Sequence, residues 1–190
     1  IAERARAIGP AIGRGGMGVI ELSRSEAEEL LRPYQTHVAV AVHQSPRFSV
    51  ISGEVEVLAE IMQTLVAREV FCRWVDVDYA SHGPQMQPLA KALAERLSGL
   101  VCHAPRVEMI STTLGTRIEG PRCDASYWAD NLQKPVQLHT AISLALTSGA
   151  RSFLEVSPHP LLTTSIQEIA RSENATVTCV PTLRRRSPEL

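Results

Sequence analysis

The stretch HVAVAVHQSPRFSVI (residues 37–51) decides the fold of the first half of this sequence. It contains two β-rich runs, residues 37–42 and 48–51, and the segment QSPR between them has the composition of a turn. We therefore expect two neighbouring strands of one sheet here.

Helical and extended patterns flank this pair of strands. Residues 55–67 place apolar side chains at helical spacing, and Ser23 or Ser25 is a suitable N-cap for a helix over residues 26–31. The expected elements, in order, are a strand over 17–22, a helix over 26–31, the two strands, a helix over 55–67 and a strand over 71–77. This β-α-β-β-α-β order predicts a ferredoxin-like unit, with two helices on one face of a small antiparallel sheet.

The second half has a different pattern, in which short apolar strands alternate with helices. We expect helices over 84–100, 127–147 and 161–171, with a break near Pro135, and strands over 107–111, 153–156 and 176–180. Such alternation favours an α/β class with a parallel sheet covered by helices. The predicted division is the end of a helix (1–12), the ferredoxin-like subdomain (13–77), an α/β body (78–180) and the start of a linker (181–190).

Composition excludes several classes of function. The 190 residues contain 19 Lys and Arg against 20 Asp and Glu, and only 4% are aromatic, which argues against nucleic acid as a partner. No run approaches the ~18 apolar residues of a membrane span, and no signal-peptide pattern is present, so we expect no membrane partner and a cytoplasmic location. The four cysteines form no C-x-x-C pair, and we expect no metal site.

The histidines are the main candidates for catalysis. The sequence contains no G-x-S-x-G, P-loop or H-E-x-x-H motif, and its Gly-rich bend at residues 13–18 precedes a strand, unlike a dinucleotide-binding loop. His82 follows a predicted strand in a strand-to-helix loop, where α/β enzymes place reactive groups. His37 and His43 are expected on strands with ordinary pKa values. Taken alone, a loop histidine is more often structural or solvated than catalytic.

Five segments in order along the chain form a more specific signal. They are GRGGM (13–17), QSPR with SG (44–47, 52–53), VDVDYASH (75–82), YWADNL with PV (127–132, 135–136) and FLEVSPHP (153–160). The set resembles the acyltransferase domains of modular type I polyketide synthases, and PTLRRR (181–186) resembles the start of the linker that follows them.

The resemblance implies an α/β-hydrolase-like acyltransferase body, of which this chain is the C-terminal part, with an inserted ferredoxin-like subdomain. It implies a serine acyltransferase that takes an acyl group from coenzyme A and passes it to the phosphopantetheine thiol of an acyl carrier protein. Acyl-CoA and phosphopantetheine are thus expected as substrates, with no bound cofactor. The expected partners are the carrier protein and the adjacent ketosynthase and linker regions of the same synthase.

The same resemblance assigns roles to individual residues. His82 would be the general base. Asn131 matches the position that supplies a main-chain carbonyl to orient this base. Arg4, 13 residues before Met17, would hold the free carboxylate of a malonyl-type substrate, with Arg6 as the alternative, and Met17 would line the acyl pocket.

Substrate choice is expected to depend on Tyr79, Ala80 and Ser81, which precede His82. Malonyl-selective relatives carry His-Ala-Phe-His here. A Phe just before the histidine would crowd an α-methyl branch, whereas Ser81 leaves room for it, so the resemblance implies methylmalonyl-CoA. Gln44 replaces the family's usual Asn at another expected substrate-binding position, and it is longer by one methylene.

One difference from the family's sequence pattern leads to two hypotheses on function. In the family the serine nucleophile lies upstream, in a G-H-S-x-G turn that this sequence does not contain, so we expect the chain to be a piece of a larger protein. The leading hypothesis is the C-terminal part of an active acyltransferase. The alternative is a non-catalytic structural or docking module of a multidomain synthase. The residues that precede Ile1 in the full-length protein would discriminate between them.

Overall fold

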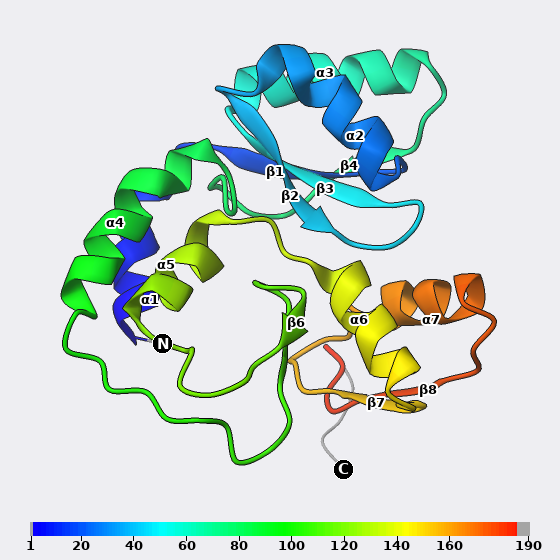
Figure 1. Cartoon of the computed structure of the whole chain (residues 1–190). Helices are drawn as coiled ribbons and strands as arrows, with labels where there is room; N and C mark the ends of the chain where they lie inside the picture. Colours follow the sequence, from blue (N-terminus) through cyan, green and yellow to red (C-terminus); the bar gives the residue numbers. More distant parts are fainter. Residues whose placement is uncertain (1, 186–190) are drawn as a thin grey trace.

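The first half of the chain folds around a four-stranded antiparallel sheet. The computed structural model describes residues 2–185, and its sheet has the strand order β2-β3-β1-β4 (Figure 1). Its elements are β1 (Gly16–Ile20), α2 (Arg24–Leu31), β2 (Val38–His43), β3 (Ser49–Gly53), α3 (Val55–Ala67) and β4 (Cys72–Trp74). The observed order β-α-β-β-α-β is the one that the sequence pattern predicts, and it is the order of a ferredoxin-like unit.

Local sequence explains why this unit forms. Ser23 caps α2, and its hydroxyl and backbone form a reciprocal capping box with Glu26. The helices α2 and α3 both lie on the same side of the sheet, as Figure 1 shows. Their apolar faces meet the strands in a core whose fully buried members are Ile20, Ile51, Leu58, Ile61 and Leu65.

The opposite side of the molecule contains a cluster of helices. These are α1 (Ala2–Ile8), α4 (Gln87–Arg96) and α5 (Ala125–Gln133), with short 3-10 turns at Gly9–Ala11 and Pro84–Met86. Met86, Leu93 and Leu132 are completely buried between them, with Ala7, Ala90 and Ala129 filling the remaining contacts. The segment that leads from β4 into α4 therefore joins the sheet to this cluster, and it contains His82 (Figure 1).

A third layer contains α6 (Leu138–Thr147), α7 (Thr163–Ser172), β7 (Ser152–Glu155) and β8 (Thr178–Pro181). The strands β7 and β8 are parallel, and the two helices pack together through Leu146, Ile169 and Ala170. The link between α5 and α6 pairs with the end of β2: Val136 N–H donates to the Ala41 carbonyl, and His43 N–H donates to the Val136 carbonyl.

The expectation of a parallel sheet across the second half is only partly correct. Within the described residues, β7 and β8 are the only parallel strand pair in a sheet, and the strand expected over 107–111 is reduced to β5 (Ile110–Ser111). It pairs antiparallel with β6 (Thr116–Arg117) across a tight turn in which Gly115 has a φ of 70°. A chain that reverses within so few residues forms a hairpin, because a parallel pairing needs a long crossover.

Other expected boundaries differ, and the strand expected over 71–77 covers only Cys72–Trp74. The helical stretch expected over 127–147 is two helices, and the expected break near Pro135 separates them. Pro181, where the linker is expected to start, belongs to β8, and Thr182 N–H donates to the Glu155 carbonyl. Residue 1 and residues 186–190 of the expected terminal segments lie outside the described residues. None of the described helices has the length and apolar character needed to cross a membrane.

Candidate active site

The loop that carries His82 is held in an unusual backbone conformation. His82 has a φ of 57°, in the left-handed region that non-glycine residues seldom occupy. The start of this loop is bound to the Gly-rich bend, because Gly13 N–H donates to the Asp78 carbonyl over 2.7 Å. Residues kept in such conformations concentrate at functional sites, since the surrounding fold must offset the strain.

One hydrogen bond fixes the ring of His82. Its Nδ1 lies 3.0 Å from the main-chain carbonyl oxygen of Lys134. A carbonyl can only accept, so Nδ1 carries the proton, and in the neutral ring Nε2 has an unshared electron pair. This is the tautomer that a general base requires.

The carbonyl that orients His82 belongs to Lys134, and the expectation that Asn131 supplies it is wrong. Lys134 is the C-cap of α5 and has an extended conformation, with φ −80° and ψ 153°. The following Pro135 favours such a conformation, and the extended backbone turns the Lys134 carbonyl away from the helix axis. Asn131 contributes through its side chain instead.

The surroundings of His82 keep it neutral. Burial is the main reason that the pKa of His82 lies below its ordinary value of 6.5. The bond to the Lys134 carbonyl opposes this shift, and the positive charge of Arg4 lowers the pKa further.

Arg4 and Arg6 have different partners, although both lie on α1. The Nε of Arg4 donates to Oδ1 of Asn131 over 3.0 Å, and Nδ2 of Asn131 donates to Oγ1 of Thr113 over 3.0 Å. Arg6 forms an ion pair with Glu3 at the surface, where 67% of its side chain is exposed. Arg4 is therefore the arginine that faces the same helix, α5, as His82.

The Gly-rich bend lies directly against the loop that precedes His82. A Cβ atom at Gly15 would be 2.6 Å from Cβ of Ala80, so only glycine permits this approach. Ala80 and Ser81 are buried, with exposed fractions of 1% and 6%. Met17, on β1, is buried with Ala41 and Val50.

Two of the expected substrate-binding residues have other contacts. Tyr79 packs against the cluster formed by α1, α4 and α5. Gln44 donates from Nε2 to the hydroxyl of Ser165 on α7 over 2.9 Å, which connects the ferredoxin-like unit to the third layer. Arg4 and His82 thus both hydrogen-bond to residues at one helix end, Asn131 and the C-cap Lys134 of α5. Gln44 instead hydrogen-bonds to α7.

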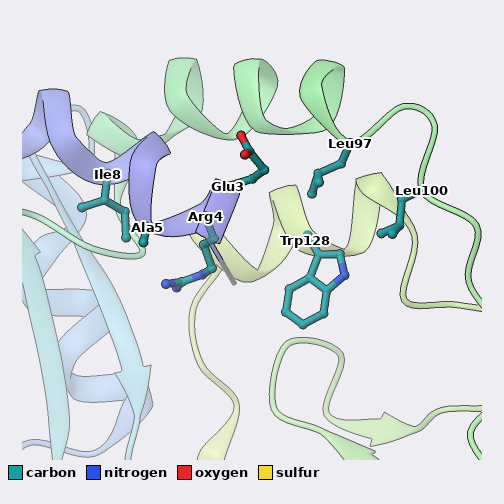
Figure 2. Close-up of a pocket in the computed structure, with 7 residues that line it drawn as sticks. All are labelled: Glu3, Arg4, Ala5, Ile8, Leu97, Leu100 and Trp128. Atoms are coloured by element: carbon teal, nitrogen blue, oxygen red, sulfur yellow. The ribbon is translucent and has the colours of Figure 1, made fainter.

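A cavity of about 510 Å³ lies next to Arg4 (Figure 2). Its lining is mostly apolar and consists of Glu3, Arg4, Ala5, Ile8, Leu97, Leu100 and Trp128. In Figure 2 the guanidinium of Arg4 extends below α1 and away from Trp128. His82 is not part of this lining, so the cavity adjoins the arginine and not the base.

Two further observations concern metal-binding and titratable groups. Among residues 2–185 no cluster of His, Cys, Asp or Glu could hold a metal ion, and the four cysteines are free thiols. The pKa of His43 differs from the ordinary value expected for it. The residue is only 5% exposed, and this burial lowers its pKa to about 4.

Sequence reasoning missed Lys134 and Thr113. Lys134 acts through its backbone carbonyl, so its side-chain type does not indicate this role. Its place before Pro135 is the available clue, because a residue before proline favours an extended conformation. Thr113 belongs to a hairpin turn that the sequence pattern did not predict.

Comparison with known proteins identifies the family. The profile described as the acyl transferase domain matches residues 1–190. The chain belongs to this family. It is an acyltransferase domain sequence of the kind found in modular type I polyketide synthases, and it is 39% identical over 172 residues to erythronolide synthase EryA2 of Saccharopolyspora erythraea. It is 37% identical over 189 residues to the phthioceranic/hydroxyphthioceranic acid synthase of Mycobacterium tuberculosis.

The acyltransferase chain spans a small part of these synthases. The matches cover 90% and 99% of the chain but only 5% and 9% of the two synthases. Among solved structures, the acyltransferase domain from module 8 of the salinomycin polyketide synthase has a TM-score of 0.94 and 33% identity. That match covers 97% of the acyltransferase chain and 44% of the solved one, and it shows a shared mixed α/β fold.

Proposed function

We propose that this chain forms part of an acyltransferase that loads methylmalonyl units from coenzyme A onto the phosphopantetheine thiol of an acyl carrier protein. The observation that carries the proposal is the His82 imidazole, which is bound through Nδ1 to the Lys134 carbonyl at the end of α5, the helix whose Asn131 binds Arg4. A neutral base and a guanidinium that are held by one helix suit a carboxylated acyl substrate.

In the first half-reaction, Nε2 of His82 takes the proton from the serine hydroxyl, which the family carries upstream of this chain. The serine oxygen attacks the thioester carbonyl and forms an ester, and the carbon–sulfur bond breaks. The departing coenzyme A thiolate takes the proton from the His82 imidazolium, so both groups leave neutral.

The second half-reaction reverses these roles. Nε2 of His82 takes the proton from the phosphopantetheine thiol, the sulfur attacks the acyl ester, and the serine oxygen leaves with that proton. Because the base must be neutral at the start of both halves, the lowered pKa of His82 favours the cycle at neutral pH.

Arg4 supplies charge complementarity to the substrate. A malonyl-type acyl group has a free carboxylate, and a guanidinium binds such a group with two parallel hydrogen bonds. The Nε of Arg4 is engaged by Asn131, so the two Nη groups are the donors that remain for the substrate. An acyl group without a carboxylate would leave this charge unpaired.

The choice of methylmalonyl rests on Ser81. Its side chain is buried in the loop against which the Gly-rich bend packs, and its small size would leave room for an α-methyl branch that a Phe would crowd. Met17 would contribute an apolar wall to the same pocket. One methyl group is worth about 1–3 kcal/mol in a pocket, so the preference should be about 10–200-fold.

The remaining assignments concern partners. We propose the acyl carrier protein as the acceptor, and the adjacent ketosynthase and linker regions of a synthase as neighbours. Acyl-CoA and phosphopantetheine would be substrates that visit the site, with no resident cofactor.

The test uses the complete domain, meaning this chain joined to the upstream family segment that carries the serine. Equal malonyl-CoA and methylmalonyl-CoA are supplied with carrier protein, and the loaded acyl group is measured by mass. Predominant methylmalonyl loading supports the proposal, and predominant malonyl loading refutes the specificity. If neither is loaded although the serine is present, the non-catalytic docking module becomes the better description. The 190-residue chain alone should show no covalent labelling.

A further inference from the structure

We propose that Thr113 is a positioning residue for the substrate clamp, acting through the side chain of Asn131 on the guanidinium of Arg4. This inference rests on the proposed function, because it assumes that Arg4 binds the substrate carboxylate. It concerns two side chains, Thr113 in the β5–β6 turn and Asn131 on α5. In this proposal neither side chain touches the substrate, but both set the orientation of Arg4.

The hydrogen-bond directions along this relay are unambiguous. The Nε of Arg4 can only donate, so the Asn131 atom 3.0 Å away must be the acceptor Oδ1. The amide nitrogen Nδ2 then faces Oγ1 of Thr113, also at 3.0 Å. Rotation of the amide by half a turn would set two donors against each other at Arg4. Arg4 therefore selects the orientation of the amide, and Thr113 holds the amide in place by accepting from its Nδ2.

Thr113 is itself firmly anchored. Its side chain is buried in the turn between β5 and β6, and its backbone N–H donates to the hydroxyl of Ser111 over 3.1 Å. Ser111 also hydrogen-bonds to the hydroxyl of Tyr127 over 2.9 Å, inside the protein. Tyr127 and Asn131 both lie on α5, so the turn that carries Thr113 is bound to the same helix that carries Asn131.

The partner of Arg4 is neutral, and that has a chemical consequence. Among residues 2–185 the ion pairs include Arg6 with Glu3 but none that involves Arg4. An amide oxygen fixes the plane of the guanidinium without neutralising its charge, and it leaves both Nη groups unoccupied by Asn131. A carboxylate at residue 131 would hold Arg4 equally well but would compete with the substrate for its charge.

The experiment compares two substrates in the complete domain. The ratio of kcat/KM for methylmalonyl-CoA to kcat/KM for propionyl-CoA isolates recognition of the carboxylate, because these acyl groups differ only there. Thr113→Val should lower this ratio about 5-fold, the effect of one lost hydrogen bond, and Asn131→Asp should lower it about 10-fold or more. Thr113→Ser, which keeps the hydroxyl, should restore most of the ratio. Ser126→Ala, on the exposed side of α5, should leave it unchanged.

A partly unfolded variant would not mislead this measurement, because both substrates meet the same active fraction and the ratio is unaffected. If Thr113→Val and Asn131→Asp lower both kcat/KM values equally, the relay is merely structural and the inference is wrong. Arg4→Ala separates this failure from that of the proposed function. A ratio that falls with Arg4→Ala but not with the relay variants refutes the relay alone, whereas a ratio that Arg4→Ala leaves unchanged refutes the clamp.

Discussion

The imidazole of His82 and the carbonyl of Lys134 are joined by a hydrogen bond of 3.0 Å that fixes both the orientation and the tautomer of the ring. The partner is a backbone group at the end of α5, placed by the extended conformation that precedes Pro135. No carboxylate is needed to orient this base. The proposed site thus depends on the helix end as much as on the histidine.

The first prediction concerns the pH dependence of acyl transfer. Burial and the charge of Arg4 lower the pKa of His82, so the neutral base should persist below pH 6.5, and activity should be lost as pH falls through the lowered value. The pH profile of kcat/KM in the complete domain should therefore have its acid limb below 6.5. Arg4→Ala should move that limb to higher pH, and Arg6→Ala should not. A limb above 6.5 in the unmodified domain would contradict the assignment.

The second prediction concerns the contact between Gly15 and Ala80. A Cβ at Gly15 would also lie 2.8 Å from the Ala80 nitrogen, which is backbone and cannot turn aside. Gly15→Ala should destabilise the domain by about 1–3 kcal/mol and slow acyl transfer by displacing the His82 loop. Gly99→Ala is the matched control, because its new methyl group would meet no atom within 4 Å. Equal unfolding free energies for the two variants, measured in urea, would show that the approach is not tight.

The third prediction concerns Glu155, a buried residue at the end of β7 whose carboxylate faces the start of α7. Its burial acts to raise the pKa, but the N–H groups of Leu161 and Leu162 and nearby hydroxyls outweigh that effect, so the pKa lies below its ordinary 4.5. Glu155→Gln should cost about 1–3 kcal/mol, because its amide would face these donors.

The pH dependence of that cost has a definite sign. A lowered pKa in the folded state stabilises the protein above the unfolded pKa, and this stability is lost as pH falls through the folded value. The difference between wild type and Glu155→Gln in urea unfolding should therefore persist from pH 7 to near 4.5 and shrink below it. The exposed Glu119→Gln should show little difference at any pH. A constant difference for Glu155→Gln across this range would argue against an ionised carboxylate.

The fourth prediction concerns the substrate branch. Ser81→Phe combined with Tyr79→His should shift loading from methylmalonyl toward malonyl, because the larger ring fills the space next to His82. Competition between equal amounts of the two thioesters measures the shift. Tyr79→His alone should change the ratio less, since Tyr79 packs against the helical cluster. An unchanged ratio in the double variant would remove Ser81 from the specificity pocket.

Local signals predicted much of this fold. The helix over residues 55–67 was predicted to the residue because its apolar spacing is regular. The β-α-β-β-α-β order followed from alternating patterns and from the Ser23 cap of α2. The β5–β6 hairpin was missed because each strand has only two residues, which is too few for a period to be visible.

The site was less predictable than the fold. His82 and Arg4 were found through their motifs, but the atoms that hold them are the Lys134 carbonyl and the Asn131 amide. Both contacts join residues more than fifty positions apart, so local sequence patterns cannot predict them. A backbone carbonyl also carries no residue identity, which is why Asn131 was given the role that belongs to Lys134.

The most direct test of the account is the rate of acyl-enzyme formation in the complete domain with His82→Ala. Rapid mixing with methylmalonyl-CoA, followed by acid quenching, measures the serine ester as it accumulates, and circular dichroism checks that the fold is retained. If His82 is the general base, the rate should fall about 10²–10⁴-fold. A folded variant that keeps more than half of the wild-type rate would contradict the account.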